Sequence, residues 1–178
     1  MTVTIDGTNG ITSPDFEVDG VTGRVYPIVS GTAVTASGTS VDFTGIPSWV
    51  KRVTVMFNGV STSGTSNRLV QIGSGSITSS GYQSSASGGA TAVTTSTSTA
   101  GFIIDNAVAA ADTISTVCFI VNVSGNIWVS SGTGTSSAGA FRANAGNVTL
   151  SGTLDRVRIT TVNGTDTFDA GSINILYE

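Results

Sequence analysis

Residues 113–129, TISTVCFIVNVSGNIWV, form the most hydrophobic strand pattern in the chain, and they decide its fold class. Side chains of an extended strand alternate between its two faces. Both faces are apolar here, so we expect a strand in the middle of a sheet. Residues 124–126 predict a hairpin turn into a second strand that begins at Ile127. One face would hold Val117, Phe119, Val121 and Val123, and the other Thr116, Cys118, Ile120 and Asn122.

Similar patterns recur along the chain at intervals of roughly 8–12 residues, with turn residues between them. Asn58-Gly59 is the strongest hairpin or turn signal among them. Helix signals are nearly absent, because the chain has one Lys, two Glu and no 3.6-residue apolar period. We therefore predict an all-β fold, an antiparallel β-sandwich of jelly-roll-like type. The tract 73–90 is expected to be a loop or a pair of ragged strands, and the glycines of 132–135 a flexible loop.

The first 30 residues differ from the rest of the chain. They are rich in turn residues, including Pro14, Gly20 and Gly23, and alternate poorly. Clear strand patterns follow. We predict a short N-terminal arm at residues 1–30, for attachment or oligomerisation, and a β-sandwich domain at residues 31–178.

Composition narrows the classes of function. Charged residues make up 10% of the chain against 39% hydrophobic residues, so its polar surface must come from hydroxyls and amides. The hydrophobic content argues against disorder, and the low charge favours an oligomer. With a net charge of −4 and no basic run, nucleic-acid binding is not expected. We also expect no membrane insertion and no signal peptide. Cys118 is expected to be a buried thiol, in a protein made in a cytoplasm.

The sequence offers little for catalysis. It contains no His, which removes the usual triads and most transition-metal sites. Most acidic residues stand at turns, where they satisfy backbone donors. A polysaccharide depolymerase is therefore disfavoured, and we expect no enzyme activity, no cofactor and no metal. A calcium site at Asp166 and Asp169 is the one metal alternative considered.

Exposed aromatic residues are the best binding candidates, because aromatic faces stack on the apolar faces of sugar rings. Tyr82 lies in a Gly/Ser tract, and Phe141 is followed by Arg142 and Asn144. We take these four residues as candidate receptor-binding residues. The alternative for each aromatic is ordinary core or oligomer packing, which is the preferred interpretation for Trp49 and Trp128 and also outweighs binding for Tyr82 and Phe141.

Three stretches carry a family resemblance. Residues 2–12, TVTIDGTNGIT, resemble the opening of many phage tail-fibre proteins. Residues 38–61, GTSVDFTGIPSWVKRVTVMFNGVS, look like a segment common in fibre-like virion proteins of tailed phages, and residues 172–178, SINILYE, are similar to their closing strand. Together they cover about a quarter of the chain, and the second is the most specific.

The resemblance implies a homotrimer assembled in the host cytoplasm and located in the virion. Its arm would bind other virion proteins, and its β-rich domain would meet the host surface, where a glycan is the candidate ligand. The function expected is that of a short tail fibre. The alternative is a capsid decoration protein (a head fibre) or a tail adaptor that binds only other virion proteins.

Overall fold

The computed structural model describes residues 16–18, 21–23, 28–106 and 109–178. Most of the predicted arm, residues 1–30, lies outside the described residues. All regular elements in the described segments are β-strands. They are β1 Phe16–Val18, β2 Val21–Gly23, β3 Val29–Ser30, β4 Val34–Thr35, β5 Val41–Thr44, β6 Arg52–Thr62, β7 Arg68–Ser74, β8 Ser76–Ile77, β9 Gln83–Gly89, β10 Thr94–Ser98, β11 Phe102–Ile103, β12 Ile114–Ser124, β13 Ile127–Ser136, β14 Phe141–Thr149, β15 Arg156–Thr161 and β16 Phe168–Tyr177.

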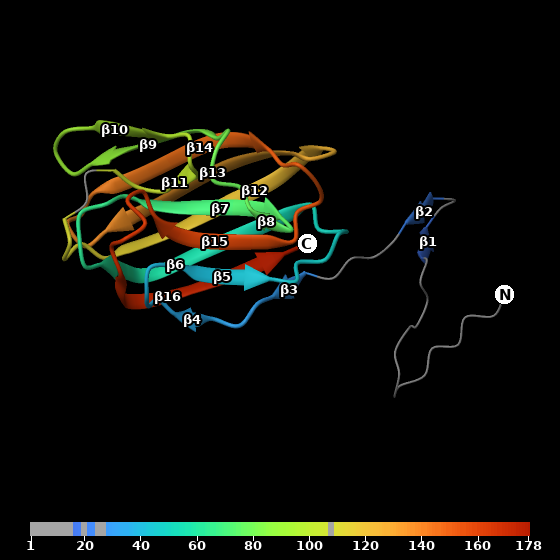
Figure 1. Cartoon of the computed structure of the whole chain (residues 1–178), viewed down its shortest axis with the longest axis horizontal. Helices are drawn as coiled ribbons and strands as arrows, with labels where there is room; N and C mark the ends of the chain where they lie inside the picture. The colour runs from blue at the N-terminus through green and yellow to red at the C-terminus, as the bar shows by residue number, and fades with distance from the viewer. Residues whose placement is uncertain (1–15, 19–20, 24–27, 107–108) are drawn as a thin grey trace.

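Two antiparallel sheets form the body (Figure 1). The nine-stranded sheet has the order β10-β9-β14-β13-β12-β6-β16-β3, and β4 also pairs with β16. The five-stranded sheet has the order β11-β7-β15-β5, with β8 beside β7. Figure 1 shows β7, β15 and β5 as a layer against the larger sheet. The predicted all-β antiparallel sandwich is confirmed, whereas its jelly-roll-like type remains a prediction.

The hydrophobic core fills the space between the two sheets. The five-stranded sheet contributes Val157 and Ile159 of β15, which are fully buried, as their alternation predicts. From the other side β6 contributes four core residues, Val53, Val55, Phe57 and Val60. Strand β12 pairs with β13 on one edge and β6 on the other, so its predicted central position is also confirmed.

The predicted turn at Asn58-Gly59 is wrong, because β6 continues through both residues. Its neighbours β12 and β16 pair with it on both sides of this point, and both ladders shift register there. Gly59 has a φ of 61°, which marks it as the left-handed residue of a β-bulge. A reversal of the chain here would break both ladders. Pairing with β12 and β16 therefore keeps the chain extended, and the left-handed glycine is accommodated as a bulge.

The glycine-rich segment 132–135, expected to be a loop, is part of a strand. Gly132 and Gly134 lie within β13, not in a flexible loop. A Cβ on Gly134 would lie 2.4 Å from Cβ of Thr116, and one on Gly132 would lie 2.5 Å from the Val117 carbonyl oxygen. Small residues are therefore required for β13 to approach β12 this closely. For the tract 73–90, the predicted alternative of a pair of strands is the one present, as β8 and β9.

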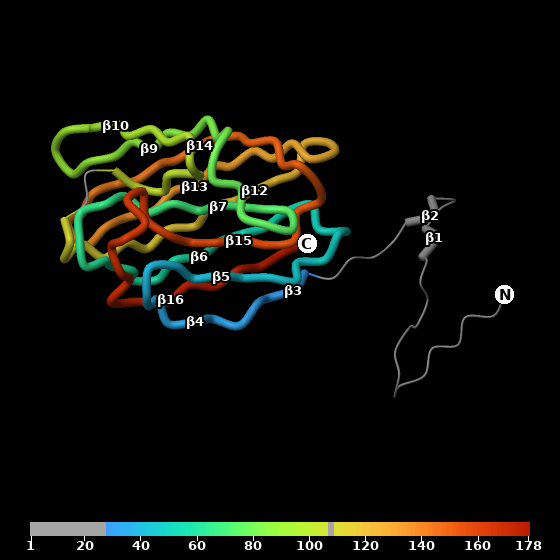
Figure 2. The backbone as a smooth tube through the Cα atoms, in the orientation of Figure 1, coloured from blue at the N-terminus to red at the C-terminus, as the bar shows by residue number. Residues whose placement is uncertain are grey.

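The first and last strands of the body lie side by side (Figure 2). Strand β16 pairs with β6 along one edge, while β3 and β4 pair with its other edge. Val29 is opposite Tyr177 in this ladder. The segment that leads into the body therefore begins beside the end of the last strand.

Candidate assembly and binding face

The outward face of the nine-stranded sheet carries a row of exposed apolar side chains. On β12 the inward residues are Thr116, Cys118 and Ile120, so the opposite face points to solvent. Phe119 is 43% exposed there. Among the residues that the structure describes, no second layer covers this side of the sheet, because the five-stranded sheet packs on its inner side. We name the row the apolar ridge: Val117, Phe119, Val121, Val123, Ile127 and Val129.

Register makes the ridge continuous across two strands. Val121 of β12 is directly opposite Val129 of β13, and such pairs have their Cβ atoms about 5 Å apart. The hairpin that joins the strands carries Val123 and Ile127, both exposed. A contiguous apolar patch of this kind on a soluble chain typically marks a surface that contacts another molecule.

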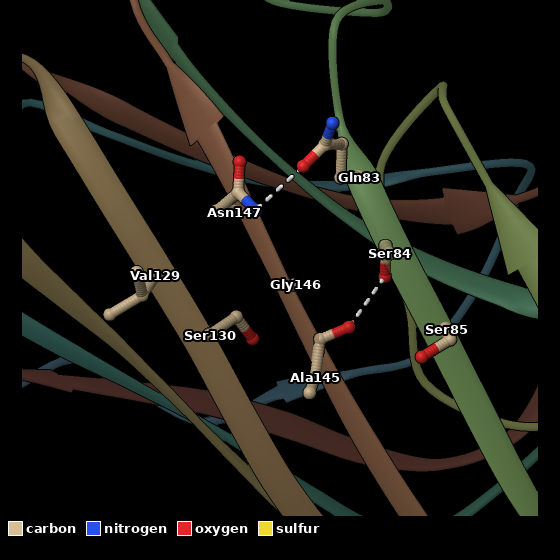
Figure 3. Close-up of a pocket in the computed structure, with 8 residues that line it drawn as sticks. All are labelled: Gln83, Ser84, Ser85, Val129, Ser130, Ala145, Gly146 and Asn147. Carbon is tan, nitrogen blue, oxygen red and sulfur yellow. Dashed lines mark hydrogen bonds between the residues drawn. The ribbon is translucent and has the colours of Figure 1, made fainter.

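A shallow trough runs beside the ridge along β9 and β14 (Figure 3). Its larger part is a depression of about 450 Å³ lined by both strands and by Val129 of β13. A second depression of about 210 Å³ continues it and shares Ser85 and Ala145. Because most of these side chains are small, this part of the sheet surface is lower than the neighbouring ridge. We define the trough by its outward residues Gln83, Ser85, Ser87, Ala143, Ala145 and Asn147.

Hydrogen bonds occupy some of the polar groups in and beside the trough. Asn147 Nδ2 donates to Gln83 Oε1 at 3.2 Å across the two strands (Figure 3). Ser84 Oγ donates to the Ala145 carbonyl at 3.2 Å. The Ser87 hydroxyl pairs with that of Thr95 at 2.8 Å. The trough therefore combines the methyl groups of Ala143 and Ala145 with the hydroxyls and amides of Gln83, Ser85, Ser87 and Asn147.

The face is electrically neutral. Strands β9, β12, β13 and β14, which the structure describes completely, have no charged side chain pointing outward. The one charged residue on them, Arg142, is buried. Charges appear at one end of the face, where Lys51 Nζ lies 3.4 Å from Asn122 Oδ1 and Arg52 pairs with Glu178. A neutral apolar centre with a polar rim is the usual anatomy of a protein interface.

Tyr82 is not on the surface, so the expectation that it is exposed is wrong. Its side chain is 1% exposed and its ring packs edge-on against Phe102, with centroids 5.0 Å apart. Its hydroxyl accepts from the Ile72 N–H at 2.8 Å and donates to the Ile72 carbonyl. Burial raises the pKa of Tyr82 to about 12. The residue ties β7 to the chain ahead of β9.

Arg142 and Asn144 are also buried, contrary to expectation. Both occupy inward positions of β14, because Phe141 points outward and the strand alternates. Arg142 Nη1 donates to the backbone and side-chain oxygens of Asn106, at 2.6 and 2.9 Å. Asn144 accepts from the thiol of Cys118 at 3.7 Å. Of the four candidate receptor-binding residues only Phe141, 59% exposed, is at the surface.

A buried ion pair lies close to Arg142. Arg68 binds Asp105 twice, through its backbone N–H at 2.9 Å and through Nη1 at 2.8 Å, and both side chains are fully buried. Arg68 Nη2 also donates to the carbonyl of Asp112. Burial raises the pKa of Asp105 above its ordinary value, although Arg68 and, more weakly, Arg142 oppose the rise. The pair holds the segment after β11 against β7, so its role is structural.

The described residues hold no group of three or more His, Cys, Asp or Glu side chains that could bind a metal. Asp166 accepts from Asn163 Nδ2 and the Ser66 N–H, and these bonds lower its pKa. Asp169 accepts instead from the hydroxyl of Ser61. The two carboxylates considered for calcium are thus held by different partners. Among the described residues, no helix is long and apolar enough to cross a membrane.

The ridge was missed by sequence reasoning, although its signal was present. Alternation placed Val117, Phe119 and Val121 on one face, but did not say which face is inward.

Comparison with protein-family models, curated proteins and solved structures gave no match to this chain.

Proposed function

We propose that this chain is a structural subunit of a bacteriophage virion, most specifically a short tail fibre that binds the host cell surface. The observation that carries the proposal is the neutral face with its apolar ridge, a surface suited to protein contact. A subunit of a packed particle covers such a surface, which would otherwise promote non-specific association. The resemblance of residues 2–12, 38–61 and 172–178 to tail-fibre proteins supports the phage assignment.

The proposal includes a homotrimer in which residues 1–30 join each subunit to the virion. Assembly would take place in the host cytoplasm. Contact with the host surface would involve the part of the body that remains exposed, and Phe141 is the candidate residue retained for it. A host glycan is the expected ligand, because an exposed aromatic ring can stack on a sugar.

A second candidate is a capsid decoration protein (a head fibre) or a tail adaptor that binds only virion proteins. The burial of Tyr82, Arg142 and Asn144 favours it, because three of the four proposed receptor contacts cannot reach a ligand. Both candidates use the same neutral face and differ in their place on the particle.

Antibody labelling of intact virions, viewed by electron microscopy, tests both candidates. Label at the tail supports the fibre and makes binding to host cells the next measurement. Label over the capsid supports the decoration protein, and a receptor-binding site would then no longer be expected. A complete absence of label from every particle contradicts the virion assignment.

We further propose that the chain binds without catalysing. Incubation with host surface polysaccharide, followed by an assay of new reducing ends, is expected to give no signal above buffer. A depolymerase used as positive control sets the detection limit of the reducing-end assay. Time-dependent release of reducing ends would overturn this part of the proposal.

A further inference from the structure

We propose that the trough and Phe141 together form the host-glycan site, and that the ligand is an uncharged polysaccharide chain lying along the trough. The inference rests on the receptor-binding role proposed above, because it takes a glycan as the ligand. It adds the place of the site, the residues that line it and the chemical class of the sugar. The apolar ridge, on the neighbouring strands β12 and β13, is left to protein contact.

Phe141 and the trough form one continuous surface. From Phe141 at the start of β14, the outward positions of the strand continue through both depressions to Asn147. Ala145 lines both depressions, which makes them parts of one groove. At about 3.3 Å per residue, Phe141 lies roughly 20 Å from Asn147 along the strand. A surface of this length suits a chain of several sugar rings better than a single ring.

Hydrogen-bonding groups in the trough match the hydroxyls of a sugar. Asn147 Nδ2 donates to Gln83 Oε1, which leaves Asn147 Oδ1 as an acceptor and Gln83 Nε2 as a donor with no partner among the described residues (Figure 3). The exposed hydroxyl of Ser85 likewise has no partner in the described part of the chain. A sugar hydroxyl both donates and accepts, so it can bind a neighbouring donor and acceptor together.

Apolar surface lies beside these polar groups. Methyl groups of Ala143 and Ala145 and the side chain of Val129 line the two depressions. The ring of Phe141 is 59% exposed and can stack on the C–H face of a sugar ring. A peptide added to this surface would need pockets for its side chains, and the trough is too shallow to supply them. The mixture of hydroxyl, amide and apolar groups therefore favours a glycan over a peptide.

The surroundings of the trough disfavour a charged ligand. Strands β9, β10, β13 and β14, which the structure describes completely, carry no charged side chain that points outward. Arg142, the one charged residue on them, is buried. Carboxylate, phosphate and sulfate groups bind most strongly to Arg or Lys, and here they would lose water without gaining a counter-charge. We therefore expect uncharged polysaccharide to be selected over acidic polysaccharide.

Titration calorimetry of the full chain with polysaccharide purified from the host surface tests the inference. Anion-exchange chromatography first separates the polysaccharide into uncharged and acidic fractions. We expect the uncharged fraction to bind and the acidic fraction to bind at least about tenfold more weakly. Phe141→Ala is expected to weaken binding about tenfold through loss of stacking. Ala145→Ile is expected to weaken it at least as much, because the larger side chain fills the point where the depressions meet.

Two variants away from the trough are the matched controls. Val162→Ala removes apolar surface from an exposed position after β15, and Thr44→Ile adds it to an exposed position of β5, so both changes belong to the other sheet. We expect both variants to bind the uncharged fraction as the unmodified protein does. Thermal unfolding followed by far-ultraviolet circular dichroism checks that every variant is folded.

Binding that survives both trough variants would place the site elsewhere and overturn the inference. Binding of the acidic fraction alone, or of neither fraction, would overturn it too. Adsorption of the protein to intact host cells separates these outcomes from a failure of the proposed function. Cells that bind the protein only until they are treated with protease would have a protein receptor, so the receptor-binding role would stand without the glycan. Failure to bind untreated cells would contradict that role itself.

Discussion

At the scale of single residues, the chain buries polar groups that its composition gives no reason to expect. Only 10% of its residues are charged, yet Arg68, Asp105 and Arg142 lie inside. Their partners come from distant segments, with Asp105 37 positions from Arg68. No local pattern reveals such a pairing. For the same reason the sequence placed Arg142 on the surface, where an isolated Arg is usually found.

Replacement of Asp105 tests the structural role of the buried pair. We expect Asp105→Ala to lower the free energy of unfolding by about 3–5 kcal/mol, because Arg68 would keep its buried charge without a carboxylate. Asp42→Ala is the control. Asp42 pairs with Arg158 at 2.7 Å, but both side chains are well exposed, so a loss of at most about 1 kcal/mol is expected. Urea unfolding measures both, and equal losses would contradict the prediction.

Buried acids make stability fall at high pH. Burial raises the pKa of Cys118 from 9.0 to about 11, and that of Tyr82 from 10.0 to about 12. Below pH 9 both groups are protonated in the folded and unfolded chains. Above pH 9 the unfolded chain loses these protons first, so the free energy of unfolding falls until the folded pKa values are passed.

Urea unfolding at several pH values checks this effect. Between pH 9 and 11, Cys118→Ala is expected to lose less stability than the unmodified protein, by an amount on the order of 2 kcal/mol. At neutral pH we expect the buried Cys118 thiol to be unreactive toward a maleimide while the protein is folded, and to react once the protein is unfolded. Identical pH profiles for the two proteins would count against a buried, protonated thiol.

At the scale of elements, alternation identifies strands well and orients them poorly. The strands at 52–57, 68–72 and 172–177 were predicted and are present. The inward face of β12 could not be predicted, because its outward face is at least as hydrophobic. The Asn58-Gly59 bulge shows a second limit. A left-handed glycine is needed equally in a hairpin turn and in a bulge, and only the neighbouring strands decide between them.

Two glycines at this bulge allow a matched test. Gly59 and Gly171 both have positive φ, 61° and 87°, in facing strands. A Cβ on Gly59 would meet nothing within 4 Å, but one on Gly171 would lie 2.4 Å from the Gly59 carbonyl oxygen. We expect Gly59→Ala to cost about 1 kcal/mol from backbone strain and Gly171→Ala about 3 kcal/mol or more. Thermal unfolding compares them, and the reverse order would refute the bulge geometry.

At the scale of the whole molecule, the sandwich class follows from strand spacing and the absence of helix signals. The pairing of distant strands, such as β9 with β14, does not follow, because many strand orders satisfy the same pattern. The neutral face is a property of this scale as well. It exists only because β9, β12, β13 and β14 become neighbours.

Removal of the predicted arm separates folding from attachment. A chain that starts at Gly31 loses β3, which pairs only two residues with β16, while β4 remains. We expect it to unfold with a free energy within about 1 kcal/mol of the full chain, but to be absent from purified particles. Particles from an infection complemented with each form, probed with the same antibody, make the comparison. Normal incorporation of the shortened chain would contradict an attaching arm.

The position of β16 also governs how the protein can be made. It is the last of the described strands to leave the ribosome, yet it lies between β6 and the β3–β4 pair. A nascent chain therefore cannot close its larger sheet before β16 has emerged, and until then β6 keeps an unpaired edge open to neighbouring nascent chains. Products of translation that stops before β16 would keep that open edge, so we expect them to aggregate.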